Sequence, residues 1–100
     1  MFGEIGTHVD GLILPGAARP HAEALANLAR DDANRVTIAE AGGIEPLIKL
    51  LDDFSENARF PAARALAELA NNDAVAVKIE QAGGIQMLAL KLAGMLAGAD

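Results

Sequence analysis

The sequence contains no cysteine, tryptophan or tyrosine, and its aromatic side chains of the Phe, Trp and Tyr type are three phenylalanines. Without cysteine the chain cannot form a disulfide, a thiolate zinc site or a cysteine nucleophile. Ser55 is the only serine, and neither Gly-Gly pair is followed by the Gly-Lys-Ser/Thr of a phosphate-binding loop. We therefore expect no enzyme and no cofactor.

Basic residues are also scarce: eight Lys and Arg stand against fourteen Asp and Glu, for a net charge of -6. Nucleic-acid binders need clustered cations that neutralise phosphates, so nucleic acid is not an expected partner. No apolar run approaches the roughly 20 residues of a membrane span, and the N-terminus lacks the pattern of a signal peptide. We expect an intracellular protein, cytoplasmic and/or nuclear, that does not bind a membrane.

What the sequence has in abundance is small and aliphatic side chains. It is 52% hydrophobic but only 3% aromatic, so a core must be built from Ala, Leu, Ile and Val. Alanine is the strongest helix former and lets helices approach closely. No stretch shows the sustained period-2 alternation of a strand. The composition therefore predicts an all-α protein.

An internal repeat decides the architecture. The sequence AGGI at 41–44 recurs at 82–85, which sets a repeat offset of 82 − 41 = 41, and ALANLA at 24–29 matches ALAELA at 65–70 with the same offset. Further matches at this offset are Pro20 with Pro61, Val36 with Val77, Ile38 with Ile79, and Leu47 with Leu88. Several separated blocks in one register indicate about two copies of one structural unit.

Each unit reads as three helices. A short helix over about 34–41 ends at Gly42-Gly43, where positive φ closes a helix. A second helix runs from Ile44 to about Asp53. A third is expected from Ser55, as its N-cap, to about Asn71, with a bend at Pro61 and a buried stripe. The stripes are Ile44, Leu47, Ile48 and Leu51 in the second helix, and Ala62, Ala63, Leu66, Leu69 and Ala70 in the third.

Three blocks together resemble the armadillo-repeat consensus: AEALANLA at 22–29, NR at 34–35 and IAEAGGIEPLIKLL at 38–51. The likeness covers about residues 19–92, and related HEAT units usually lack this series. It implies a right-handed α-solenoid of three-helix repeats. The units would be a partial leading helix (1–14), a first repeat (15–53) and a second repeat with an apolar C-terminal helix (54–100). Ile5, Val9 and Leu12 form the stripe of the leading helix.

The resemblance also implies a function. Third helices of armadillo proteins line a concave groove that holds a partner protein or extended peptide, and a recurrent Asn on them binds the peptide backbone. Asn27 takes that position here, with Glu68 as its repeat mate. Glu23 and Arg64 stand where nuclear-import adaptors have Trp, so a receptor for nuclear-localisation signals is not implied. The groove candidates are Arg19, Glu23, Asn27, Arg30, Phe60, Arg64, Glu68 and Asn71.

A structural interpretation stands beside the functional one. Arg19 with Glu23, and Arg64 with Glu68, are i,i+4 pairs that stabilise an exposed helix by about 0.2–0.5 kcal/mol without any ligand. Phe60 is expected to pack beneath the Pro61 bend. His8 and His21 fall in different predicted helices without an obvious carboxylate partner, so no metal site is expected.

The last segment, 85–98, is apolar nearly all round, with Lys91 its only charge. Contiguous apolar patches on soluble monomers are uncommon, so self-association is an alternative to partner binding. Its candidates are Met87, Leu90, Met95 and Leu96, which would form a homo-oligomer. A third possibility makes the chain the substrate-recognition segment of a larger armadillo protein, such as a ubiquitin ligase or kinase.

Overall fold

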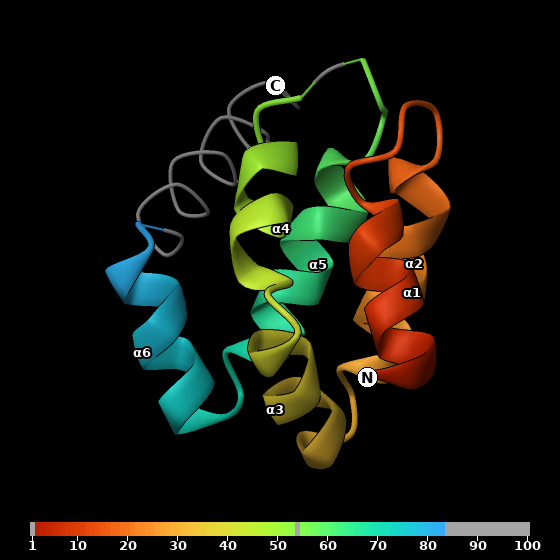
Figure 1. Cartoon of the computed structure of the whole chain (residues 1–100). Helices are drawn as coiled ribbons and strands as arrows, with labels where there is room; N and C mark the ends of the chain where they lie inside the picture. Colours follow the sequence, from red (N-terminus) through yellow and green to blue (C-terminus); the bar gives the residue numbers. More distant parts are fainter. Residues whose placement is uncertain (1, 54, 84–100) are drawn as a thin grey trace.

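The computed structural model describes residues 2–53 and 55–83, and these residues form six helices and no strand (Figure 1). None of the described helices has the length and apolarity that a membrane crossing requires. The prediction of an all-α chain is confirmed for this part of the sequence. The helices are α1 (Gly3–Gly11), α2 (Ala18–Leu28), α3 (Asp32–Glu40), α4 (Ile44–Leu50), α5 (Arg59–Leu69) and α6 (Asp73–Gln81).

The repeat offset of the sequence reappears in the helix bounds. α2 begins at Ala18 and α5 at Arg59, so their starts differ by 59 − 18 = 41, and the starts of α3 and α6 differ by 73 − 32 = 41. Each of these two pairs also matches in length. The starts of α1 and α4 differ by the same amount, 44 − 3 = 41. The same series of three helices therefore occurs twice in the described residues. The predicted boundaries between the repeat units, at residues 14/15 and 53/54, stay predictions.

Two pairs of equivalent helices lie side by side. α2 packs along α5 in the most extensive helix contact of the described structure, and α3 packs on α6. Within each copy, α1 packs on α2 and α4 packs on α5 (Figure 1). Alanine dominates the α2–α5 contact, where Ala18, Ala22 and Ala62 are fully buried. Such small side chains let the two helices approach closely.

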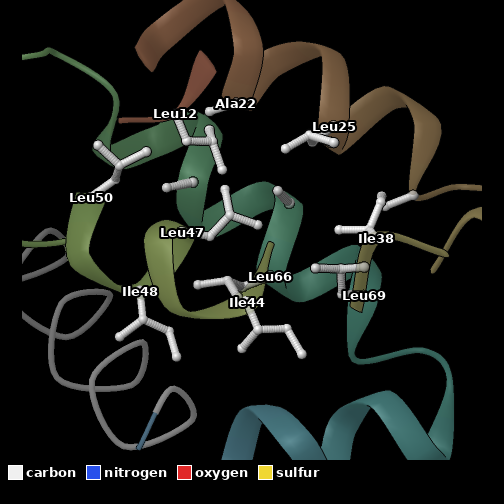
Figure 2. Packing of buried hydrophobic residues seen from close by; sticks show 14 of the residues in the cluster. Leu12, Ala22, Leu25, Ile38, Ile44, Leu47, Ile48, Leu50, Leu66 and Leu69 are labelled. Carbon is white, nitrogen blue, oxygen red and sulfur yellow. The ribbon is translucent and has the colours of Figure 1, made fainter. Parts of the chain in front are cut away.

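Figure 2 shows the core where side chains of α2, α3, α4 and α5 converge, with Leu47 in the middle. The predicted stripe of α4 (Ile44, Leu47, Ile48 and Leu51) is buried, and so are Ile5, Val9 and Leu12 of the first helix and the turn after it. In the predicted α5 stripe, only Ala70 is partly exposed. Burying one Leu or Ile contributes roughly 1.5–3 kcal/mol, so the fully buried aliphatic side chains are the main stabilising contribution.

Three helices carry proline in their first turn. Pro20, Pro46 and Pro61 are each the third residue of α2, α4 and α5. The first four N–H groups of a helix have no acceptor within it, so proline removes no hydrogen bond there. The predicted bend at Pro61 is therefore wrong, because Pro61 lies in the first turn of α5 and not between two helical pieces.

Ser55 is not the N-cap of α5, and this prediction is also wrong. α5 begins at Arg59, and residues 55–57 form a turn. The Ser55 backbone N–H and hydroxyl both donate to Asp53 Oδ1, at 2.9 and 2.6 Å. Serine closes such local turns as readily as it caps helices, and here the aspartate two residues earlier takes its hydroxyl.

Candidate functional site

The groove candidates form one row on the paired helices α2 and α5, which we call the α2–α5 ridge. Seven of the eight side chains are exposed and Glu68 is half-buried. The two halves of the row are equivalent at the repeat offset, because positions 19, 23, 27 and 30 correspond to 60, 64, 68 and 71. The ridge comprises Arg19, Glu23, Asn27 and Arg30 from α2 and its end, and Phe60, Arg64, Glu68 and Asn71 from α5 and its end.

Hydrogen bonds along the ridge join the two helices. Arg19 Nε donates to Glu23 Oε1 at 2.9 Å, which is the i,i+4 pair predicted from the sequence. Arg64 does not form its predicted pair with Glu68 in the described structure. Its Nη2 instead reaches across to α2 and donates to Asn27 Oδ1 at 3.1 Å and, more weakly, to the Glu23 carbonyl at 3.5 Å. Close packing of α2 on α5 makes this longer-range acceptor accessible.

Arg64 contacts only the oxygen of the Asn27 side-chain amide. The side-chain carbonyl oxygen accepts from the guanidinium, while the NH₂ group makes no hydrogen bond to the described part of the protein. An amide carries two donor hydrogens on that nitrogen. Because Asn27 is exposed, an incoming carbonyl oxygen can reach those donors.

Phe60 is not packed beneath Pro61. Its side chain is 67% exposed, so this prediction is wrong. The physical reason is the start of α5: Phe60 is the second helical residue, Ala58 just before the helix is the buried one, and no bend folds over the ring. The ridge therefore presents an aromatic side chain at the N-terminal end of α5.

The Asn-Arg pair at 34–35 holds the end of α2 in place. Asn34 Nδ2 donates to the Leu28 carbonyl at 3.0 Å, and Arg35 Nε donates to the Ala29 carbonyl at 2.7 Å. Arg35 Nη2 adds a bond to the Arg30 carbonyl at 3.0 Å. Terminal carbonyls of a helix have no partner within it, and these two side chains supply one. The pair therefore supports the ridge and does not belong to it.

A side chain of the next unit caps the N-terminal end of α2. Its N-cap residue, Ala17, has no side-chain acceptor. Glu56 instead accepts from the Gly16 N–H at 3.1 and 3.2 Å through its two oxygens, and from the Ala18 N–H at 3.4 Å. A carboxylate at this end of a helix is favoured by the free N–H groups and the helix dipole. With Ser55 as the N-cap, as the sequence predicted, Glu56 would have stood in the first turn of α5; α5 begins at Arg59, so this placement is wrong.

Two carboxyl groups outside the ridge have altered acidity. The pKa of Asp32 lies below its ordinary value because Asn72 Nδ2, at 3.0 Å, and then Arg35 donate to the carboxylate. The pKa of Asp53 is also lowered, chiefly by the Ser55 hydroxyl.

The ridge itself has three Arg and two Glu, so its formal charge is +1, and the remaining chain carries −6 − 1 = −7. A mildly cationic surface thus lies on an acidic protein.

His8 and His21 lie together, which sequence reasoning missed. His8 Nδ1 and His21 Nδ1 are 2.9 Å apart, and the ring centroids are separated by 5.2 Å. Glu4 Oε1 stands 3.8 Å from His8 Nε2. Within residues 2–53 and 55–83, no group of three or more His, Cys, Asp or Glu gathers as metal ligands. The contact arises because α1 packs on α2, which brings position 8 opposite position 21.

The candidates for self-association, Met87, Leu90, Met95 and Leu96, lie outside the described residues.

Comparison with known protein families gives one match. The family described as armadillo/beta-catenin-like repeat matches residues 31–71, a segment that contains α3, α4 and α5 complete. Neither curated proteins nor solved structures gave a significant match. The order of a short helix, a second helix and a longer third helix within the matched segment agrees with the resemblance drawn from the sequence. Residues 31–71 thus match the armadillo/beta-catenin-like repeat, as the resemblance drawn from the sequence indicates.

Proposed function

We propose that the chain binds another protein as an extended peptide along the α2–α5 ridge. Armadillo repeats generally mediate protein–protein interaction and are typically non-catalytic. The observation that carries the proposal is the Asn27–Arg64 contact, because it presents a fixed amide donor in the middle of an exposed row of polar side chains.

An extended peptide needs polar partners that lie along a surface. Its backbone offers a carbonyl and an N–H in each residue, and these groups lose water on binding. Asn27 supplies the donors, since Arg64 occupies only its oxygen. Because Arg64 holds the amide before any peptide arrives, less side-chain entropy is lost when the complex forms.

The side chains of the ridge indicate the chemistry of the peptide. Arg64 and Arg30 contribute positive charge, and Phe60 adds an exposed aromatic ring at one end of the row. A peptide with an acidic residue and an apolar residue fits this order of charge and aromatic surface. Charge complementarity of this kind mainly increases the association rate and the specificity. We place this binding role inside the cell, in the cytoplasm and/or nucleus.

The test compares peptide binding by matched variants. Peptides selected from a displayed library against the intact chain are measured by calorimetry with the wild type and with Asn27→Ala/Arg64→Ala. Loss of two hydrogen-bonding groups is expected to weaken binding about tenfold or more, since each such bond is worth roughly 0.5–1.5 kcal/mol. Circular dichroism checks that the variant is folded.

The control is Glu40→Ala/Lys78→Ala, which changes exposed charges on α3 and α6. It is expected to bind as the wild type does. Unchanged affinity in the folded Asn27→Ala/Arg64→Ala variant would show that the peptide binds elsewhere.

A further inference from the structure

The imidazoles of His8 and His21 approach each other from two helices. His8 lies on α1 and His21 on α2, and their Nδ1 atoms are 2.9 Å apart with the rings tilted by 54°. The His8 side chain is 21% exposed, so the pair lies at the edge of the α1–α2 contact where water can reach it. Neither residue belongs to the α2–α5 ridge.

Gly11 makes room for this arrangement. A Cβ atom at position 11 would collide with three atoms of the His21 ring, Cγ, Cδ2 and Nε2. The ring therefore lies directly against the glycine backbone in α1, and any larger residue there would displace it. Glycine in a helix is destabilising by roughly 0.5–1 kcal/mol relative to alanine, so its presence is explained by the close approach of the ring.

The separation of the two nitrogens matches that of adjacent ligands on a metal ion. Two nitrogens about 2.0–2.1 Å from one ion are about 2.9 Å apart when the bonds meet at a right angle, and about 3.4 Å apart in a tetrahedron. Right-angled nitrogen ligands are typical of the tetragonal sites that Cu²⁺ and Ni²⁺ prefer. We propose that His8 and His21 form a two-imidazole site for a divalent ion of this class, completed by water.

Glu4 supports the same assignment. Metal-binding histidines commonly direct their other ring N–H at a carboxylate, which fixes the tautomer and makes the ligating nitrogen more basic. Glu4 Oε1 is 3.8 Å from His8 Nε2, one helical turn away on α1. In the tautomer that has its hydrogen on Nε2, the nitrogen nearer Glu4, His8 Nδ1 would carry the lone pair that binds the ion. A bound ion would join α1 to α2.

A direct hydrogen bond between the imidazoles is the alternative use of this pair. It requires one Nδ1 to carry hydrogen and the other to accept it. Displacing the His21 ring abolishes both the metal site and the hydrogen bond, so only a metal titration distinguishes these two interactions.

The experiment titrates the untagged full chain with Ni²⁺ by calorimetry at pH 7.5, and follows the imidazole nitrogens by NMR. We expect one Ni²⁺ per chain, with shifts at Nδ1 of both histidines and a raised melting temperature. Affinity is expected to fall at least tenfold in His21→Asn and in Gly11→Ala. The second variant keeps both histidines and removes only the space that lets them meet.

Binding common to all three proteins is assigned to other groups of the chain. If the wild type shows no tighter binding than His21→Asn, the site does not exist. Equal affinity of wild type and folded Gly11→Ala means that the histidines bind independently, which also overturns the proposal. Should circular dichroism show Gly11→Ala unfolded, His8→Asn and His21→Asn decide: loss in both supports the site, and retention in either contradicts it.

Discussion

At the scale of single residues, Arg35 links the end of α2 to α3 through three side-chain hydrogen bonds. It binds the Ala29 and Arg30 carbonyls and pairs with Asp32 at 3.2 Å, although it lies on the short helix α3. Asn34 beside it binds the Leu28 carbonyl. These two residues are a prominent part of the resemblance to armadillo repeats, and their function here is to fix where α2 ends and α3 begins. The second unit has Val75 and Ala76 at the positions equivalent by the repeat offset.

Arg35→Ala is expected to destabilise the fold by about 1.5–3 kcal/mol, because it removes charged hydrogen bonds, including the part-buried one to the Ala29 carbonyl. Urea unfolding followed by circular dichroism measures the change. Arg30→Ala is the matched control, since Arg30 is exposed and surface substitutions usually change stability by less than about 0.5 kcal/mol. Equal effects of the two substitutions would contradict the structural role of Arg35.

Asp32 offers a pH-dependent test of the contact between α3 and α6. Asn72 lowers its pKa below the ordinary value of 3.8, so the contribution of the carboxylate to stability is fully present above that value. It is lost as pH falls through the lowered pKa of the folded state. Asn72→Ser keeps an oxygen to cap α6 but shortens the donor, and is expected to raise the pKa of Asp32. NMR titration of the Asp32 carboxyl carbon measures it; an unchanged midpoint would contradict the contact.

At the scale of elements, the two glycines between α3 and α4 have different functions. Gly42 has a φ of +84°, in the left-handed region that side chains with a Cβ rarely adopt. Gly43 has an ordinary φ, but a Cβ there would lie 2.8 Å from Ile38 Cγ2 and 3.2 Å from Val9 Cγ2. The first glycine thus lets the chain turn, and the second lets α4 approach α3 and α1.

Substitutions by asparagine separate the two functions. Asn adopts left-handed φ more easily than other residues, so Gly42→Asn is expected to cost less than Gly42→Ala, for which about 1–2 kcal/mol is lost. At position 43 the order reverses, because the larger Asn side chain must displace Ile38 while Ala adds one atom. Thermal unfolding of the four variants measures both orders. The same order at both positions would contradict this division of functions.

Sequence periodicity predicted the helices well, and the reason is local. The stripe Ile44, Leu47, Ile48 and Leu51 and the Gly42-Gly43 stop depend on residues within a few turns of each other. Ser55 and Phe60 were misplaced because their environment depends on where α5 starts. The sequence pattern predicted a start at the Ser55 cap, whereas α5 starts at Arg59, two residues before Pro61.

The candidate site was predicted as a row of positions but not as a set of contacts. The repeat offset identified which side chains share the ridge. It could not show that Arg64 binds Asn27 in preference to Glu68, or that His8 meets His21. Both contacts depend on how closely the Ala-rich and Gly-containing helices approach, and that distance results from packing of the whole core.

At the scale of the whole molecule, the side chains of Glu56, Arg64 and Asn72 join the two copies within the described residues. Glu56 closes α2 at Gly16 and Ala18, Arg64 binds Asn27, and Asn72 binds Asp32. Each joins positions separated in the chain by about one repeat. In stacked repeats, stability is approximately the sum of unit and neighbour contributions, so these contacts fix how one unit sits on the next. They also hold the α2 and α5 halves of the ridge in a common register.

Binding along the α2–α5 ridge is tested most directly by NMR. Backbone amide shifts of the labelled chain are recorded as a peptide selected from the displayed library is added, first to the wild type and then to Asn27→Ala/Arg64→Ala. The largest shifts are expected within residues 19–30 and 60–71, and they should be lost in the double variant. Shifts confined to α3 and α6, with the ridge amides unmoved, would contradict the proposed function.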